Sequence, residues 1–145
     1  MPITPIVDTD TLAAFCDHQK GAQFITVDTE FVREKTYYPI LCLVQIAGPE
    51  EEAVIDAMAP GIDLSPLATL FADESILKVL HAGRQDNEIF YNLFGAVPTP
   101  MFDTQIAAMV SGFGDQVAYG TLVQKLVGVA IEKTSRFADW SHRPL

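Results

Sequence analysis

The sequence predicts an α/β fold with a mixed five-stranded sheet and helices on both of its faces. Three strand-like runs, at residues 23–27, 41–47 and 53–56, follow one another without a helix between them, which is typical of an antiparallel meander. After residue 64, strand-like runs at 76–80 and 100–102 alternate with helical patterns, which is typical of β/α units. A meander followed by β/α units predicts one mixed sheet.

The first half of the chain contains the expected meander. The acidic cluster at residues 8–10 could cap a first helix from Thr9 to Phe15, with Leu12 and Phe15 facing inward. Residues 23–27 (QFITV) are rich in β-branched and aromatic residues, as strands are. Residues 41–47 (LCLVQIA) are apolar nearly throughout, which indicates a strand covered on both faces. The Gly48-Pro49 pair predicts a turn into the third strand.

The second half contains the expected β/α units. Ser65 and Pro66 begin a helix of about two turns, because proline suits the first helical position. Residues 84–94 predict a helix that stops at Gly95 and presents Ile89, Phe90, Leu93 and Phe94 on one face. A helix over residues 104–110 is expected with Asp103 at its N-cap, and apolar residues recur at helical spacing over residues 119–127, before Gly128.

Length and composition indicate one globular domain, over residues 1–145. A hydrophobic fraction of 49% and a charged fraction of 19% are globular values. No apolar run approaches the roughly 18 residues of a membrane span, and the N-terminus lacks a signal-peptide pattern. Cys16 and Cys42 are too few for a disulfide framework. We therefore expect a cytoplasmic protein that does not associate with membranes.

The net charge of −10 argues against nonspecific electrostatic binding to the phosphates of nucleic acid. The sequence has no Lys/Arg cluster and no interleaving of aromatic and basic residues. An enzyme of this charge that acts on nucleic acid would have to bind the end of the nucleic-acid strand through metal ions, without contacting a long stretch of its phosphate backbone.

Two carboxylates in the segment FITVDTEF, at residues 24–31, require an explanation. Alternate strand residues share a face, so Asp28 and Glu30 would point the same way about 7 Å apart. Two carboxylates on a half-buried sheet are costly unless a cation lies between them. The alternative is that the strand ends at Val27 and residues 28–30 form a solvated turn.

Asp86 favours the cation hypothesis. It precedes Ile89 and Phe90 by three and four residues, so it extends the apolar stripe of the predicted helix. An acidic residue that merely complements the helix dipole would not need the buried face. A metal held jointly by Asp28, Glu30 and Asp86 explains all three carboxylates, and such hard oxygen ligands suit Mg²⁺ or Mn²⁺.

Other candidate residues have simpler explanations. His81 ends a predicted strand and could belong to a site, although a hydrogen-bonded structural histidine is at least as consistent with its place. The sequence contains no recognisable Ser or Cys nucleophile motif, no P-loop and no G-x-G-x-x-G.

Four segments together resemble one family. Residues 27–31 (VDTEF) with 33–47 resemble the first motif of ribonuclease D-type 3′–5′ exonucleases, and residues 81–86 (HAGRQD) resemble the second. Residues 103–108 (DTQIAA) and 139–145 (DWSHRPL) are similar to connecting segments of that family. The family belongs to the DEDD superfamily and has a ribonuclease H-like fold, which agrees with the fold predicted above.

The resemblance implies a two-metal hydrolase that removes nucleotides from RNA 3′ ends, tRNA precursors above all. Asp28 would bridge two divalent ions (Mg or Mn), Glu30 would bind the ion that activates water, and Asp86 would serve the second ion. Phe31, His81 and Gln85 would contact substrate, with Phe31 near the terminal base. Phe31 as an ordinary core aromatic is an equally good interpretation.

The sequence departs from the family pattern at its end. The third motif, Tyr-x-x-x-Asp, would follow residues 143–145 and supply a fourth carboxylate, and the helical HRDC-type modules would follow later. Neither is present in this sequence. We therefore expect an exonuclease domain that is C-terminally incomplete. The alternatives are a catalytically incomplete module that binds RNA or protein, and a related DNA exonuclease. The oligomeric state is not indicated by the sequence.

Overall fold

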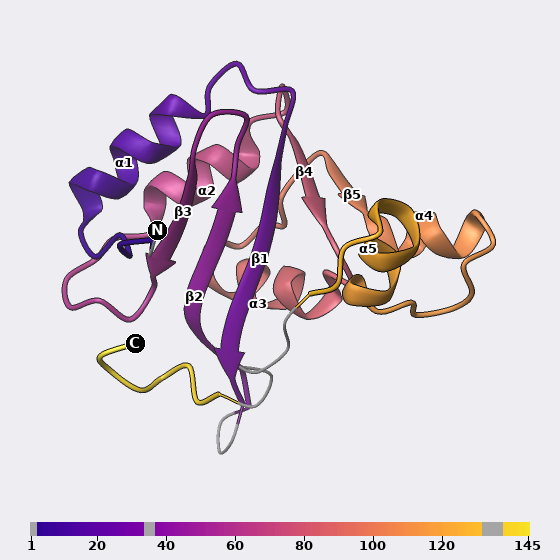
Figure 1. Cartoon of the computed structure of the whole chain (residues 1–145). Coiled ribbons are helices and arrows are strands. Elements are labelled where there is room, and N and C mark those ends of the chain that lie inside the picture. Colours follow the sequence, from indigo (N-terminus) through magenta and orange to yellow (C-terminus); the bar gives the residue numbers. More distant parts are fainter. Residues whose placement is uncertain (1–2, 34–36, 132–137) are drawn as a thin grey trace.

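The computed structural model describes residues 3–33, 37–131 and 138–145, and it contains one five-stranded sheet in the order β3-β2-β1-β4-β5 (Figure 1). The pairs β1–β2 and β2–β3 are antiparallel, whereas β1–β4 and β4–β5 are parallel. The mixed sheet predicted from the sequence is therefore confirmed. The strands are β1 (Phe24–Val32), β2 (Ile40–Ala47), β3 (Glu52–Asp56), β4 (Leu77–Leu80) and β5 (Met101–Asp103).

Strand β1 is longer than the run of β-forming residues that predicted it. It continues to Val32 because β2 pairs with it throughout, with Asp28 opposite Gln45 and Glu30 opposite Leu43. The alternative of a solvated turn over residues 28–30 is therefore wrong. The register shifts between Glu30 and Phe31, because β2 has one extra residue there, Cys42, between their partners Leu43 and Leu41.

Strand β4 pairs with only the first part of β1. Leu77 to Val79 lie beside Phe24 to Thr26, and β4 ends at Leu80. The later part of β1 thus extends past the carboxyl end of its parallel neighbour. In open α/β sheets, ligands commonly bind in the crevice outside these strand ends.

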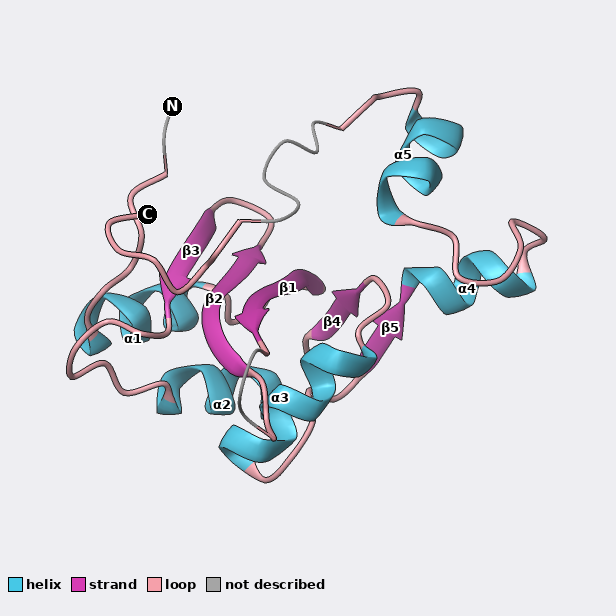
Figure 2. Ribbon diagram, turned by 90° about the horizontal axis from the view of Figure 1, so that it is seen from below, coloured by secondary structure: helices cyan, strands magenta, loops and turns pink. Residues whose placement is uncertain are grey.

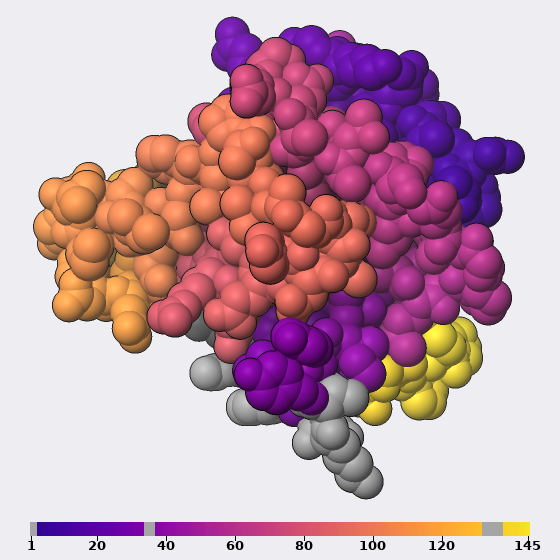
Figure 3. Space-filling model, turned by 180° about the vertical axis from the view of Figure 1, so that it is seen from behind, coloured from indigo at the N-terminus to yellow at the C-terminus, as the bar shows by residue number. Residues whose placement is uncertain are grey.

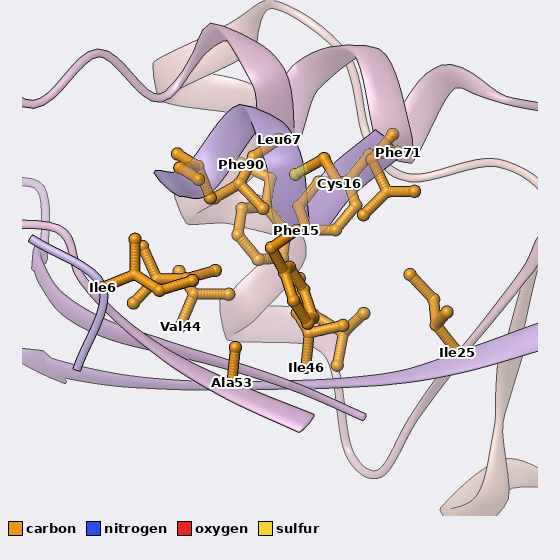
Figure 4. Close-up of a cluster of buried hydrophobic side chains, with 14 of the residues drawn as sticks. Ile6, Phe15, Cys16, Ile25, Val44, Ile46, Ala53, Leu67, Phe71 and Phe90 are labelled. Atoms are coloured by element: carbon orange, nitrogen blue, oxygen red, sulfur yellow. The ribbon is translucent and has the colours of Figure 1, made fainter. Parts of the chain in front are cut away.

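Three helices cover one face of the sheet (Figure 2). They are α1 (Thr9–His18), α2 (Ser65–Ala72) and α3 (Arg84–Phe94). Their apolar faces and the sheet enclose the main core (Figure 4), which includes Ile6, Leu12, Phe15, Ile25, Val44, Ile46, Leu67, Phe71, Ile89 and Phe90. Helix α1 runs three residues further than predicted, and Leu93 is half exposed, so only part of the predicted α3 stripe is buried.

The remaining helices extend the β5 edge of the sheet. Helix α4 (Thr104–Val110) follows β5 directly, and Asp103 caps it as predicted by accepting a hydrogen bond from the Gln105 amide. Helix α5 (Tyr119–Val127) lies on the side of the sheet opposite α1–α3, near this edge (Figure 2). Helices thus lie on both sides of the sheet, although the described helices leave much of the second face open. No helix in the described residues is long and apolar enough to cross a membrane.

The last described segment, residues 138–145, is attached to β3 by an ion pair. The Arg143 guanidinium donates to both carboxylate oxygens of Asp56, at 2.8 and 2.6 Å. It also donates to the Trp140 carbonyl oxygen at 2.6 Å. The Arg143 guanidinium holds the pKa of Asp56 below its ordinary value. This paired geometry suits the planar guanidinium group and no other side chain.

We predict that Arg143→Lys loosens residues 138–145, because an ammonium group keeps the charge but cannot make the paired contact. Chymotryptic cleavage after Trp140, followed by mass spectrometry, should accelerate by roughly tenfold, as expected for losing one charged hydrogen bond. The matched control is Arg84→Lys, since the Arg84 side chain is 94% exposed. Equal cleavage rates in both variants would contradict the attachment.

Candidate active site

The candidate site lies where β1 passes the end of β4 and the chain turns into α3. The turn contains Ala82, which has a positive φ of 53°, and Gly83. A Cβ atom on Gly83 would lie 2.9 Å from Cβ of Leu80, so a larger residue here would require Leu80 or the turn to shift. The turn therefore fixes where α3 begins relative to the sheet.

Asp103, at the end of β5, holds this turn in place. Its carboxylate accepts hydrogen bonds from the backbone amides of Ala82 at 3.0 Å, Gly83 at 2.9 Å and Gln105 at 2.9 Å. These donors lower the pKa of Asp103. The N-cap predicted from the sequence is thus also the anchor of α3, a role that the sequence alone did not reveal.

Asp28 and Glu30 occupy alternate positions of β1 and lie on the face away from the main core. Asp28 lines a hollow of about 530 Å³ together with His81, Thr104 and Tyr119. Solvent reaches Asp28, but the surrounding protein atoms still raise the pKa of its carboxyl group. The strand geometry predicted for this pair is confirmed.

Asp86 approaches β1 from the opposite, helix-covered face. It is 7% exposed and accepts a hydrogen bond from the Thr29 hydroxyl. Thr29 itself is buried between Asp28 and Glu30 along the strand. The predicted placement of Asp86 on the buried face of its helix is confirmed, and Thr29 is a partner that no sequence pattern indicated.

The three carboxylates lie close enough together that the negative charge of one disfavours ionisation of the others. Burial raises the pKa of Glu30 to about 7, and the charges of Asp28 and Asp86 add to that effect. Burial also raises the pKa of Asp86, against the opposing hydrogen bond from Thr29, and Asp28 raises it further. A cation bound here would relieve this repulsion.

The carboxylates are neighbours, but they do not converge on a single point. Among the described residues, no group of three or more His, Cys, Asp or Glu side chains is arranged to hold a metal ion. The reason is visible in the strand: Asp28 and Glu30 leave one face of β1, whereas Asp86 meets Thr29 on the other. The all-oxygen donor set still suits Mg²⁺ or Mn²⁺, with Asp28 and Glu30 on one side and Asp86 behind them.

The structure also places the three residues expected to contact substrate. Phe31 is half-buried and packs against the main core. Both ring nitrogens of His81 are engaged, Nδ1 with the Thr104 hydroxyl and Nε2 with the Val117 carbonyl oxygen, each at 2.8 Å. Gln85 is exposed in the first turn of α3. These contacts favour structural roles for Phe31 and His81, while Gln85 stays open to solvent.

Comparison with known proteins identifies similar sequences and structures. A family model described as 3′-5′ exonuclease matches residues 3–145. The chain is 61% identical over 140 residues to a protein named Ribonuclease D from Acidiphilium cryptum, covering 97% of this chain. It is 55% identical over 142 residues to a Ribonuclease D from Granulibacter bethesdensis, covering 98% of this chain. The chain spans 36% of the length of each of these relatives.

Solved structures share the fold. The RNase D of Escherichia coli, described as an exoribonuclease involved in structured RNA processing, superposes with a TM-score of 0.94 at 41% identity, over 100% of this chain and 38% of that one. The catalytic core of RRP6 from Trypanosoma brucei gives 0.87 at 26% identity, over 99% and 40%. NrnC of Brucella melitensis, solved with bound Mg²⁺, gives 0.75 at 29% identity, over 88% and 62%.

The raised pKa of Glu30 predicts how stability depends on pH. Its pKa is about 7 in the folded chain and 4.5 ordinarily, so folding takes up a proton between these values. The stabilising contribution is complete below about pH 4.5 and is lost as pH rises through about 7. In EDTA, the urea midpoint should therefore fall between about pH 5 and about pH 8.

Glu30→Gln should flatten this pH dependence, whereas Glu74→Gln, at an exposed position, should leave it unchanged. Adding Mg²⁺ or Mn²⁺ at the higher pH should raise the midpoint of the unsubstituted chain. If Glu30→Gln kept the pH dependence of the unsubstituted chain, the electrostatic account of this site would be wrong.

Proposed function

This chain belongs to the 3′–5′ exonuclease family, and from that membership we propose that it is the exonuclease domain of a ribonuclease D-type exoribonuclease. It would hydrolyse phosphodiester bonds one at a time from RNA 3′ ends. The observation that carries the proposal is the grouping of Asp28, Glu30 and Asp86, with raised pKa values, where β1 continues past the carboxyl end of its parallel neighbour β4. The relatives named Ribonuclease D support the RNA substrate.

Finer features of the function belong to the same proposal. We propose tRNA precursors as the substrate, two divalent ions as the cofactors and the cytoplasm as the compartment. The E. coli structure, whose protein is described as processing structured RNA, supports the first of these. The Mg²⁺ bound in NrnC supports the choice of ion.

Asp28 and Glu30 would hold the metal on the open face of β1, and Asp86 would act from the helix-covered side. When bound, such ions activate the attacking water and stabilise the leaving oxygen. The protein's own contribution is to keep the carboxylates in place. Thr29 fixes Asp86 through its hydroxyl, and Asp103 fixes the start of the helix that carries Asp86.

A second candidate function has one observation in its favour. Because no three acidic or histidine side chains among the described residues are arranged to hold an ion, the chain could be a binding module that lacks catalysis. The two candidates differ in metal-dependent hydrolysis, which can be measured directly.

We predict that Asp28→Asn lowers Mg²⁺- or Mn²⁺-dependent shortening of a 5′-labelled RNA by at least roughly 10²-fold, as expected when a transition-state stabiliser is removed. The control is Asp17→Asn, which changes the net charge equally at an exposed position on α1. Gel analysis of the products reports both rate and direction. Full activity of Asp28→Asn would overturn the metal-site assignment. No activity in any variant, with RNA still bound, would favour the binding module.

A further prediction concerns the fourth carboxylate. A version of the chain continued through the expected Tyr-x-x-x-Asp motif should hydrolyse RNA much faster than residues 1–145, because a fourth oxygen ligand would complete the metal site. The same gel assay measures both versions side by side. Equal rates would contradict the role assigned to that aspartate.

A further inference from the structure

A second surface lies beside the candidate site, and neither the carboxylates nor their partners belong to it. It is a groove of about 580 Å³ between α3 and the chain segments at the end of β1 and the start of β2. In Figure 3 the purple surface that leads into β2 adjoins the pink-to-salmon surface of α3. Its described lining includes Arg33, Tyr37, Tyr38, Arg84, Glu88 and Tyr91.

The wall contributed by α3 is a regular helical stripe. Arg84, Asn87, Glu88 and Tyr91 follow one another at intervals of i, i+3, i+4 and i+7 and therefore share one face. Asp86 lies on a different face of the same helix, which is buried against β1. One helix thus presents the candidate site on one side and the groove on another.

Lysine and arginine side chains are scarce in this protein, and two of them line the groove. Six of the nine lysines and arginines lie in the described residues. Three of these are engaged elsewhere: Lys20 with Asp17 at 2.6 Å, Lys78 with two backbone carbonyl oxygens and Arg143 with Asp56. Of the other three, two line the groove (Arg33 and Arg84), and the third is Lys125 on α5.

The two groove arginines are accessible to a ligand. Arg33 is exposed, and no ion pair between described residues involves it. Arg84 is 94% exposed, and its contact with Glu88 is long, at 3.8 Å. An exposed pair of this kind contributes little, so a phosphate that offers paired oxygens would compete well for the guanidinium.

The groove also has exposed aromatic rings. Tyr37 is 86% exposed and Tyr91 is 60% exposed, although a tyrosine ring ordinarily covers part of its area against protein. The Tyr37 and Tyr38 rings meet edge to face, with centroids 4.9 Å apart. Exposed aromatic faces combined with cations are the features that bind successive bases and phosphates of a single strand.

We propose that this groove binds the single-stranded RNA upstream of the 3′ nucleotide that is cleaved, an inference that rests on the proposed function. Arg33 follows Glu30 by three residues along the chain, and Arg84 precedes Asp86 by two. A strand whose 3′ end lies at the carboxylates would therefore reach these arginines with its next phosphates. The tyrosines would stack on its bases without a strong sequence preference.

The test measures RNA binding in the Asp28→Asn background, so that the RNA is not shortened. Fluorescence anisotropy is recorded in Mg²⁺ for a labelled single-stranded RNA of about eight nucleotides, a typical single-strand site length, and for a dinucleotide. Arg33→Gln with Arg84→Gln should weaken binding of the longer RNA on the order of tenfold. A plot of log affinity against log salt concentration has a negative slope, and this slope should become shallower by roughly 1.4. That is about 0.7 for each phosphate that an arginine no longer neutralises. Dinucleotide binding should be unchanged.

A matched double variant, Lys20→Gln with Lys125→Gln, removes the same charge at exposed sites outside the groove and should keep the original slope. Tyr37→Ala should also weaken the longer RNA on the order of tenfold, whereas Tyr37→Phe should not, because stacking needs only the ring. If the two arginine substitutions matched the lysine control, or weakened the dinucleotide equally, the groove assignment would be overturned. Loss of hydrolysis in Asp28→Asn would still support the exonuclease assignment.

Discussion

The hydrogen bond from Thr29 to the buried carboxylate of Asp86 is the contact on which the candidate site depends. A buried carboxylate is costly unless it has donors, and the position of α3 decides whether Thr29 can supply one. That position rests on two features of the preceding turn. Gly83 lies so close to Leu80 that a side chain at this position would force a shift, and Asp103 accepts hydrogen bonds from the amides of Ala82 and Gly83. The site is therefore built by β1, β4, α3 and the end of β5 together.

The strand lengths explain why Asp28 and Glu30, on either side of this buried contact, are accessible. β4 stops shortly after pairing with Thr26, so among the described residues no strand pairs with the later part of β1 on that side. Pairing with β2 nevertheless keeps Asp28 and Glu30 extended on one face. Asp28 and Glu30 are thus within reach of water and a ligand, Asp86 lies buried behind them, and each of the three has a raised pKa. The net charge of −10 is compatible with an RNA substrate if cations neutralise this cluster and arginines contact the strand nearby.

Local patterns were sufficient to predict much of this arrangement. The bounds of α3, the burial of Asp86 and the N-cap at Asp103 all follow from helical spacing and capping preferences, and the structure confirms them. The length of β1 did not follow, because its second half contains charged residues and is held by pairing with β2. The face from which Asp86 meets β1 was also not predictable, since strand periodicity gives relative faces but not the side on which a later helix packs. Leu93 is exposed for a similar reason, because the width of the buried stripe depends on the neighbours of the helix.

Helix α3 links the two surfaces of this region through its geometry. It has 11 residues, and its faces carry Asp86 with Ile89 and Phe90 toward the core and Arg84 with Tyr91 toward the groove. Burial of the first face leaves the helix little freedom to rotate. This burial therefore also fixes the positions of Arg84 and Tyr91 on the second face. Turning the helix enough to move Arg84 would withdraw Asp86 from Thr29. The same core packing that makes a buried carboxylate tolerable therefore determines the direction in which a bound strand would leave the site.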